Sequence, residues 1–133
     1  MKLWFNLLCR DIEAQFDFYR RLLDLPEAVG SRSPIYRALE TEDFQFGFNA
    51  HAAYGLLGIS GRQPGDEASE PAVVAYATLM LKGPEDVDRV CQVAASLGGS
   101  LIKGPFATYY GQWQAVLNDV EGNVFRVAAR GLP

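Results

Sequence analysis

The chain has 133 residues, of which 49% are hydrophobic, enough for one compact domain with a buried core. Its formal net charge of −4 provides no basic surface for nucleic acid and no polybasic segment for a membrane, and no apolar run approaches the roughly 20 residues of a membrane span. We therefore expect neither nucleic acid nor membrane as a partner. The two cysteines, Cys9 and Cys91, make no disulfide framework and no secretory signal is recognisable, so we expect a reduced, cytoplasmic compartment.

The first sixty residues are predicted to form a strand, a helix and three further strands. An apolar run from Leu3 to Cys9 indicates the first strand. The helix is predicted to begin after Asp11, whose side chain can cap it, and to end before Pro26, because apolar residues recur between them at helical spacing. The further strands are predicted at Ala28 to Ser31, Ile35 to Glu40 and Phe44 to Asn49. The last of these alternates phenylalanines with Gln, Gly and Asn, which is period-two patterning.

The composition changes at about residues 61–71, which hold no large apolar residue and are predicted to be an exposed linker. The order of elements then repeats, with a strand at Ala72 to Leu81 and a helix from Pro84 to the Gly98-Gly99 pair. Strands follow at Ser100 to Lys103, Gln112 to Asn118 and Asn123 to Ala129. The chain is therefore predicted to be a single domain of two modules, about 1–60 and about 72–130, that can enclose a shared concave space.

Three segments resemble the vicinal-oxygen-chelate superfamily, which holds glyoxalase I, extradiol dioxygenases and bleomycin-resistance proteins. Cys9 to Leu25 looks like the family's first strand and helix, Lys82 to Gly99 like its second helix, and Asn118 to Val127 like its terminal hairpin. Asp24 replaces the usual glycine, and aspartate enters the left-handed conformation more readily than most residues. The resemblance implies an α+β fold with two βαβββ modules, whose curved eight-stranded mixed sheet surrounds a cavity and carries its helices outside. It also implies a homodimer, as in many members.

The resemblance further implies where a metal site would lie, since metal-using members take one ligand, commonly His or Glu, from each of four strands. The corresponding positions here are Trp4, Gly47 (or by parity Asn49), Tyr76 and Arg126. Divalent metals need imidazole, carboxylate or thiolate donors, and an arginine adds a positive charge that repels the ion. We therefore expect no family-type metal site and no cofactor. A displaced site would have to use His51, Glu40 or Glu42.

A ligand site is predicted from the side chains that family parity turns toward the cavity and from the aromatic segment Phe106 to Trp113. Its residues are Trp4, Asn6, Gly47, Tyr76, Thr78, Tyr110, Trp113 and Arg126. Such a lining suits a planar or aromatic small molecule that offers Arg126 an anionic or carbonyl group. Two alternatives remain: Arg126 pairs with a neighbouring carboxylate, and the aromatic segment forms a dimer contact or buries its own loop.

The leading hypothesis is a metal-free protein of the bleomycin-resistance-like branch, which binds an aromatic or drug-like molecule. The alternative is a metal-dependent glyoxalase-like lyase or dioxygenase with a displaced metal site, and a third reading is a scaffold or regulatory module with a filled cavity. His51 is expected to be a loop or rim residue, or else a catalytic base or pocket hydrogen-bond donor. Cys9 and Cys91 are expected to be packed core thiols rather than reactive ones.

Overall fold

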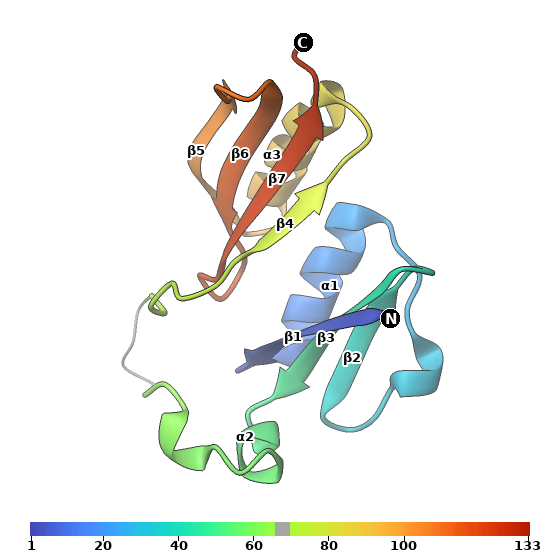
Figure 1. The fold of residues 1–133 in the computed structure, drawn as a ribbon. Coiled ribbons are helices and arrows are strands. Elements are labelled where there is room, and N and C mark those ends of the chain that lie inside the picture. The colour runs from blue at the N-terminus through green and yellow to red at the C-terminus, as the bar shows by residue number, and fades with distance from the viewer. Residues whose placement is uncertain (66–69) are drawn as a thin grey trace. The chain divides into compact units, whose positions relative to one another are not determined.

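The structure, a computed structural model, describes residues 1–65 and 70–133. The chain divides into two compact units, Met1–Ala68 and Ser69–Pro133, and each has its own sheet and helix (Figure 1). Part of the predicted linker, residues 66–69, lies outside the described residues. None of the helices in the described ranges is long and apolar enough to cross a membrane.

The first unit is a three-stranded sheet with one long helix. Strands β1 (Leu3–Cys9), β2 (Tyr36–Glu40) and β3 (Phe44–Ala50) lie in the order β1-β3-β2, with β1 parallel and β2 antiparallel to β3. Helix α1 (Ile12–Leu23) packs on one face, where the ring of Tyr19 lies 4.8 Å from that of Phe46 and 5.5 Å from that of Phe48. The predicted period-two strand is thereby confirmed, with its phenylalanines toward the helix.

Both predicted ends of α1 are confirmed. The Asp11 side chain accepts a hydrogen bond from the backbone N–H of Ala14 at 3.0 Å, as an N-cap residue does. At the other end Asp24 adopts the left-handed conformation with φ 51°, and its backbone N–H bonds to the carbonyl of Arg20. Aspartate therefore fills the position where the family usually has glycine.

One predicted strand of the first unit is absent. The segment Ala28 to Ser31 is not a strand: Val29–Ser31 form the short 3-10 helix η1, and the isolated bridges to β2 come from the flanking residues Glu27 and Ser33. A short helix that the sequence did not indicate, α2 (Ala52–Leu56), follows β3 and buries Ala53 and Tyr54. A second 3-10 helix, η2 (Ser60–Arg62), lies within the start of the predicted linker.

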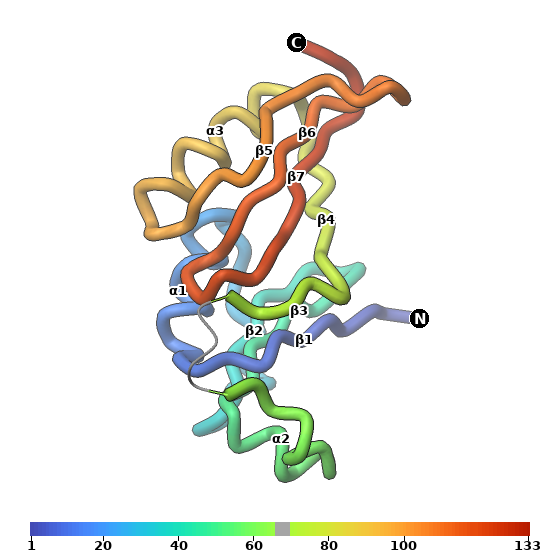
Figure 2. Tube along the Cα trace, turned by 90° about the vertical axis from the view of Figure 1, so that its left-hand side faces the viewer, coloured from blue at the N-terminus to red at the C-terminus, as the bar shows by residue number. Residues whose placement is uncertain are grey.

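The second unit is a four-stranded sheet covered on one face by a helix. Its strands are β4 (Ala77–Met80), β5 (Ser100–Ala107), β6 (Gln112–Asn118) and β7 (Val124–Arg130), in the order β4-β7-β6-β5. Helix α3 (Pro84–Ser96) lies along one side of this sheet (Figures 1 and 2). The predicted elements are all present, although β4 is much shorter than predicted.

The described strands thus form one sheet of three and one of four, so the eighth strand is missing and a single eight-stranded sheet is not confirmed. The terminal hairpin is confirmed, because β6 and β7 pair antiparallel from Asn118 and Val124 onward. Its turn is held by Asp119, whose carboxylate accepts from the backbone N–H groups of Glu121 and Asn123 at 2.9 and 3.0 Å.

Candidate functional site

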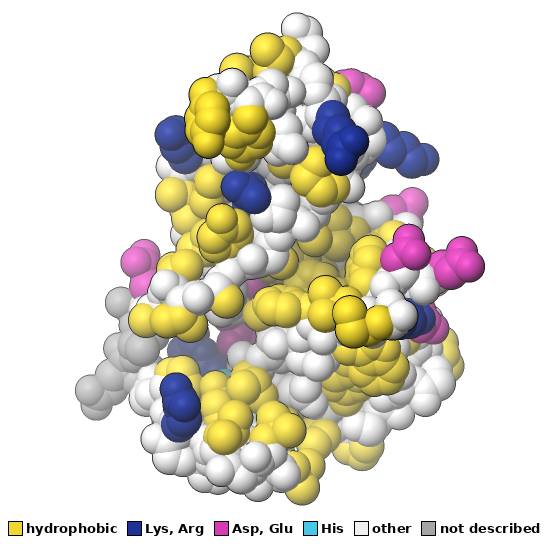
Figure 3. All heavy atoms as spheres, in the orientation of Figure 1, with side chains coloured by type: hydrophobic (Ala, Val, Ile, Leu, Met, Phe, Trp, Pro, Cys, Tyr) yellow, Lys and Arg dark blue, Asp and Glu magenta, His cyan; other side chains and the backbone are white. Residues whose placement is uncertain are grey.

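The sheet of the second unit carries cations and no acidic residue. Lys103, Arg126 and Arg130 lie on its strands, and none of the residues of β4, β5, β6 or β7 is Asp or Glu. Figure 3 shows lysine and arginine side chains among hydrophobic ones over this unit. In a chain of net charge −4 this sheet is therefore a local region of positive charge.

Pairing and one hydrogen bond identify the two faces of this sheet. The indole N–H of Trp113 on β6 donates to Asp88 of α3 at 2.7 Å, so Trp113 and its neighbours in register lie on the helix side. Arg126 pairs in register with Thr78 and Val116, which alternate with the residues of the helix side. Arg126 and Thr78 therefore lie on the face that α3 does not cover.

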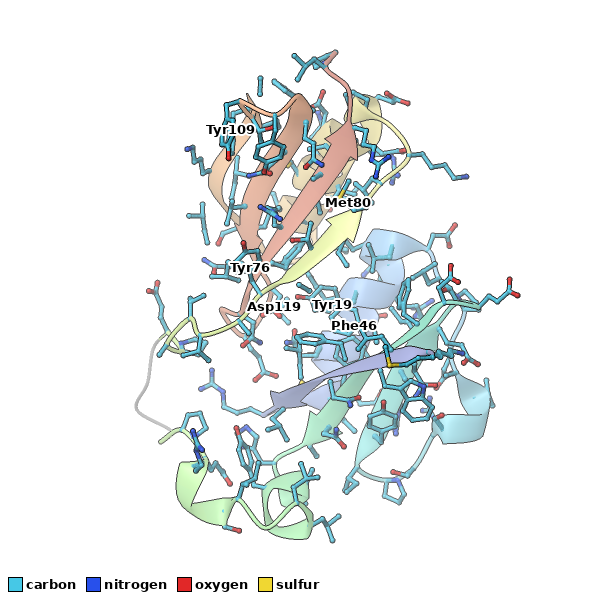
Figure 4. The ribbon with its side chains drawn as sticks, viewed as in Figure 1. Tyr19, Phe46, Tyr76, Met80, Tyr109 and Asp119 are labelled. Carbon is cyan, nitrogen blue, oxygen red and sulfur yellow. The ribbon has the colours of Figure 1, made fainter. Side chains whose placement is uncertain are left out.

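Three predicted site residues come together on this uncovered face. The Nε–H of the half-buried Arg126 donates to the Thr78 hydroxyl at 3.0 Å, and its guanidinium carbon lies 5.3 Å from the ring centroid of Tyr76. That distance is within the range of a cation–π interaction. Tyr76 is 51% exposed and directly precedes β4, where Figure 4 shows it together with Met80.

The guanidinium of Arg126 is oriented but not neutralised within its unit. Its Nε–H is taken by Thr78, and among the described residues 70–133 no carboxylate lies within ion-pair distance of it. An internal ion pair of Arg126, one of the two alternatives, is thus not found within this unit. The Nη1 and Nη2 groups remain as donors that could meet an anion in a fork geometry.

The aromatic segment places its two predicted site residues on different faces. Tyr110, in the turn between β5 and β6, donates its hydroxyl to the side-chain oxygen of Gln114 at 3.1 Å, and Gln114 pairs with Ala128 on the uncovered face. Trp113 lies on the helix side and is not brought together with Arg126. Figure 4 shows Tyr109 in the same turn.

The three predicted residues of the first unit lie on the face of its sheet that α1 does not cover. Asn6 pairs in register with Gly47, and Trp4 with Gln45, on the side opposite to the phenylalanines of β3. Trp4 is 53% exposed and Asn6 is also exposed. The Asn6 side-chain oxygen accepts from the Tyr36 hydroxyl at 2.7 Å.

Gly47 has a structural role that the sequence did not suggest. A Cβ atom there would lie 2.0 Å from the Tyr36 hydroxyl oxygen and 2.2 Å from the Asn6 side-chain oxygen. The space that a side chain at position 47 would need is therefore filled by the hydrogen bond between Tyr36 and Asn6. Gly47 is buried beneath that bond.

Comparison with known proteins identifies the family. A family model described as the Glyoxalase/Bleomycin resistance protein/Dioxygenase superfamily matches residues 3–127. The chain belongs to this superfamily. A crystal structure of a glyoxalase/bleomycin resistance protein/dioxygenase family enzyme from Burkholderia phytofirmans PsJN is 36% identical, with a TM-score of 0.87 and 95% of each chain covered. The resemblance stated from the sequence is confirmed.

More distant members share the fold alone. A glyoxalase-related enzyme from Fulvimarina pelagi is 17% identical, with a TM-score of 0.77 over 98% of this chain and 88% of that one. A lactoylglutathione lyase from Agrobacterium tumefaciens is 14% identical, with a TM-score of 0.64 over 97% of this chain and 92% of that one. No curated protein sequence matches the chain.

The residues at the four positions that the resemblance assigns to metal ligands do not fit a divalent ion. Position 126 is a guanidinium already bonded to Thr78, position 76 is the tyrosine beside it, and position 4 is an indole. At Gly47 a glutamate side chain would meet Tyr36 and Asn6. Within the described residues no group of three His, Cys, Asp or Glu side chains is arranged to hold a metal. These positions offer N–H donors and aromatic rings where a metal needs anionic or imidazole ligands.

The three residues proposed for a displaced metal site are not brought together. His51 follows β3 and its Nδ1 lies 3.2 Å from the Gln63 side-chain nitrogen. Glu40 pairs in register with Gln45, near the opposite end of β3, and forms an ion pair with Lys2 at 2.9 Å. Glu42 is exposed in the turn after β2.

Cys9 lies in the core as predicted, whereas Cys91 is only partly buried. Cys9 is fully buried, with its thiol 3.5 Å from the carbonyl oxygen of Leu7. Cys91 on α3 is half-buried, and burial, with a smaller contribution from the nearby Asp88, raises the pKa of its thiol. A raised pKa disfavours the reactive thiolate form.

Sequence reasoning missed several polar residues next to the predicted ones. Tyr36, Gln45 and Ser31 join Asn6 in one hydrogen-bonded series, and Gln114 accepts from Tyr110. Gln45 could have been found, since it alternates with Phe44 and Phe46 and so must share the face of Gly47. Tyr36 and Ser31 had no such signal.

Proposed function

We propose that this superfamily member binds a small aromatic acid without a metal ion, and that Arg126 is its anion anchor. The observation that carries the proposal is the arrangement of Arg126, with its Nε–H held by Thr78, its guanidinium against Tyr76 and no carboxylate partner among residues 70–133. A carboxylate would receive the remaining Nη donors in a charge-assisted pair. An aromatic ring attached to that carboxylate could contact the exposed part of Tyr76.

Charge and position both support an anionic ligand. Four strands with three cations and no acid favour the approach of an anion, and the half-buried setting of Arg126 lessens the screening of its charge by salt. The positive charge of these strands also disfavours a bound metal cation at Arg126. The superfamily's catalytic chemistry is therefore not assigned to Arg126, whose proposed role is binding.

Matched probes test the proposal. We expect 2-naphthoate to raise the melting temperature of the protein and its uncharged analogue 2-naphthamide to do so much less, because a ligand stabilises the native state to which it binds. Arg126→Ala should weaken 2-naphthoate binding by about 1.5–3 kcal/mol, which is about 10- to 150-fold, and leave 2-naphthamide binding unchanged. Isothermal titration calorimetry measures both affinities.

Arg130→Ala is the matched control, because Arg130 lies on the same strand and is exposed. It removes the same charge but should change the 2-naphthoate affinity less than twofold. Thr78→Val keeps the shape of Thr78 and removes the acceptor for the Arg126 Nε–H, so we expect an intermediate loss. An unchanged 2-naphthoate affinity in Arg126→Ala would remove Arg126 from the site.

The alternative is a metal-dependent lyase or dioxygenase, and the names of similar proteins favour it: the 36% identical structure is called a family enzyme. Such chemistry in this chain would need ligands other than those at positions 4, 47, 76 and 126. About one tightly bound divalent ion per purified chain would support this alternative over metal-free binding.

A further inference from the structure

A largely buried amide lies on the same sheet face as Arg126 and has no part in the anion contact proposed above. It belongs to Gln114 of β6, which is 7% exposed. Gln114 pairs in register with Ala128 of β7, whereas Arg126 pairs with Val116. Alternate residues of a strand share a face, so Gln114, like Arg126, lies on the side of the sheet that α3 does not cover.

The register places these two polar side chains within reach of one small molecule. Gln114 and Arg126 are diagonal neighbours on adjacent antiparallel strands, and such positions lie about 7–8 Å apart. The other two corners of this square are Val116 and Ala128, whose side chains are short and apolar. A ligand held at Arg126 and directed toward Gln114 would therefore cross only short apolar side chains.

The hydroxyl of Tyr110 determines which end of the Gln114 amide is available to a ligand. It donates to the side-chain oxygen at 3.1 Å, so this oxygen is already bonded, and the NH2 group points the other way with its two donors. Within residues 70–133 no acceptor is bonded to these donors. The described polar atoms that are fully buried without a partner do not include this nitrogen, so it is accessible from outside.

Open donors are unusual on a side chain that is as buried as Gln114. Buried polar groups are normally hydrogen-bonded, because a donor that is withdrawn from water without a partner costs free energy. In Gln114 the oxygen has its partner in Tyr110, whereas the nitrogen has none within its unit. An amide held in one orientation with its donors open is typical of a group that selects a ligand by a hydrogen bond.

We infer that the aromatic acid of the Arg126 site carries a hydrogen-bond acceptor on its ring, remote from the carboxylate, and that the Gln114 amide donates to this acceptor. The inference rests on the proposed function, because Arg126 is taken to hold the carboxylate. Tyr110 is a positioning residue, since its hydroxyl bonds to the amide oxygen and thereby orients the donors. The ligand class is thus narrowed to aromatic acids with a carbonyl or a comparable acceptor at the far end.

Two para-substituted benzoates test this inference in the full chain. 4-Acetylbenzoate has a ketone acceptor opposite its carboxylate, whereas 4-isopropylbenzoate has a group of similar size without an acceptor. The dissociation constant of 4-isopropylbenzoate divided by that of 4-acetylbenzoate is the selectivity ratio, and isothermal titration calorimetry measures both constants. Gln114→Met keeps the length of the side chain and removes the amide. The selectivity ratio should therefore fall about three- to tenfold, the range of one neutral hydrogen bond.

Gln112→Met is the matched control, because Gln112 lies on the same face of β6 and pairs with Arg130, farther from Arg126. It should leave the selectivity ratio unchanged. Tyr110→Phe removes the hydroxyl that orients Gln114, so the ratio should fall while the affinity for 4-isopropylbenzoate changes less than twofold. A purely structural role of Tyr110 would instead weaken both benzoates equally, and that result would remove its positioning role.

Arg126→Ala distinguishes a failure of this inference from a failure of the proposed function. It should weaken the binding of both benzoates alike and leave the selectivity ratio unchanged. If it weakens neither, the anion site fails and the inference fails with it. If it weakens both but Gln114→Met leaves the ratio unchanged, only the inference is overturned.

Nitrogen-15 NMR of the unaltered chain tests the same hydrogen bond without requiring a variant to fold. 4-Acetylbenzoate should shift the Gln114 side-chain NH2 signals more than 4-isopropylbenzoate does, because only the ketone accepts from this group. Equal shifts with the two benzoates would contradict donation by Gln114.

Discussion

Gly47 shows how a single missing side chain can position others. A Cβ at this buried position would reach within 2.2 Å of two oxygen atoms, those of Tyr36 and Asn6, which are bonded to each other. Because both atoms are ends of side chains, the backbone of β3 need not move, but the hydrogen bond between them must break. Gly47 therefore admits that bond, and its place in the ligand site stays a prediction.

We predict that Gly47→Ala lowers the free energy of unfolding by about 1 kcal/mol, because the lost bond outweighs the gain from reduced freedom of the unfolded chain. It should also shift the NMR signals of the Asn6 side-chain amide. Urea denaturation measures the first effect. Gly30→Ala is the control, since no heavy atom lies within 4 Å of a Cβ at Gly30, and it should raise the free energy of unfolding slightly through the same reduced freedom of the unfolded chain. Identical behaviour of the two variants would contradict the role given to Gly47.

At the residue scale, the sequence predicted the sheet face on which a side chain lies, but it did not predict the side chain's hydrogen-bond partner. The alternation around Phe46 placed Gly47 opposite the core, and the register with Asn6 confirms that placement. The partner Tyr36 lies 30 residues from Asn6 along the chain, and its contact depends on how β2 adds to the sheet. Periodicity holds no information on that contact. In the same way it could not predict that Trp113 would bond to Asp88 of α3.

At the scale of elements, helix α1 ends in a conformation that suits glycine better than the aspartate it contains. Asp24 has φ 51° and is exposed. A left-handed conformation costs an L-residue free energy that glycine avoids. We predict that Asp24→Gly raises the free energy of unfolding by about 0.5–1 kcal/mol, after part of the gain is offset by the greater freedom of the unfolded chain.

The same substitution at Asp17 serves as the control for the helix end. Asp17 lies in the middle of α1 and pairs with Arg20 at 2.8 Å. Asp17→Gly should lower the free energy of unfolding by about 0.5 kcal/mol, because glycine has a lower helix propensity than aspartate and an exposed ion pair adds little. Urea titrations of both variants should give shifts of opposite sign. Two shifts of the same sign would contradict a conformational cost at Asp24.

Elements with strong local signals were predicted well, and those that depend on a neighbour were not. The hairpin of β6 and β7 has its own signal in the Asp119 turn, whose carboxylate bonds to two nearby backbone N–H groups. The segment 28–31 has no period-two pattern. The backbone N–H of Ala28 bonds to the Ala38 carbonyl of β2 at 2.8 Å, and the chain then forms η1, which the sequence does not distinguish from a short edge strand.

At the scale of the whole molecule, superfamily membership does not by itself assign the chemistry. Three sequence segments were enough to indicate the family, and the match over residues 3–127 confirms it. The four positions that the resemblance assigns to metal ligands carry here an indole, a glycine, a phenol and a guanidinium. A homodimer stays a prediction from the resemblance, and native mass spectrometry of the purified chain would show its mass directly.

The metal content of that purified protein gives the most general test of the proposed function. We predict less than about 0.1 divalent ion per chain, because Arg126 places a fixed positive charge at one expected ligand position. Elemental analysis after dialysis against Zn²⁺ measures this content. His51→Gln is the matched variant, since His51 is the chain's one histidine. A stoichiometric ion in the unaltered chain that is lost in His51→Gln would establish a displaced metal site and favour the lyase or dioxygenase alternative. We expect instead that the chain holds no ion and still binds 2-naphthoate through Arg126.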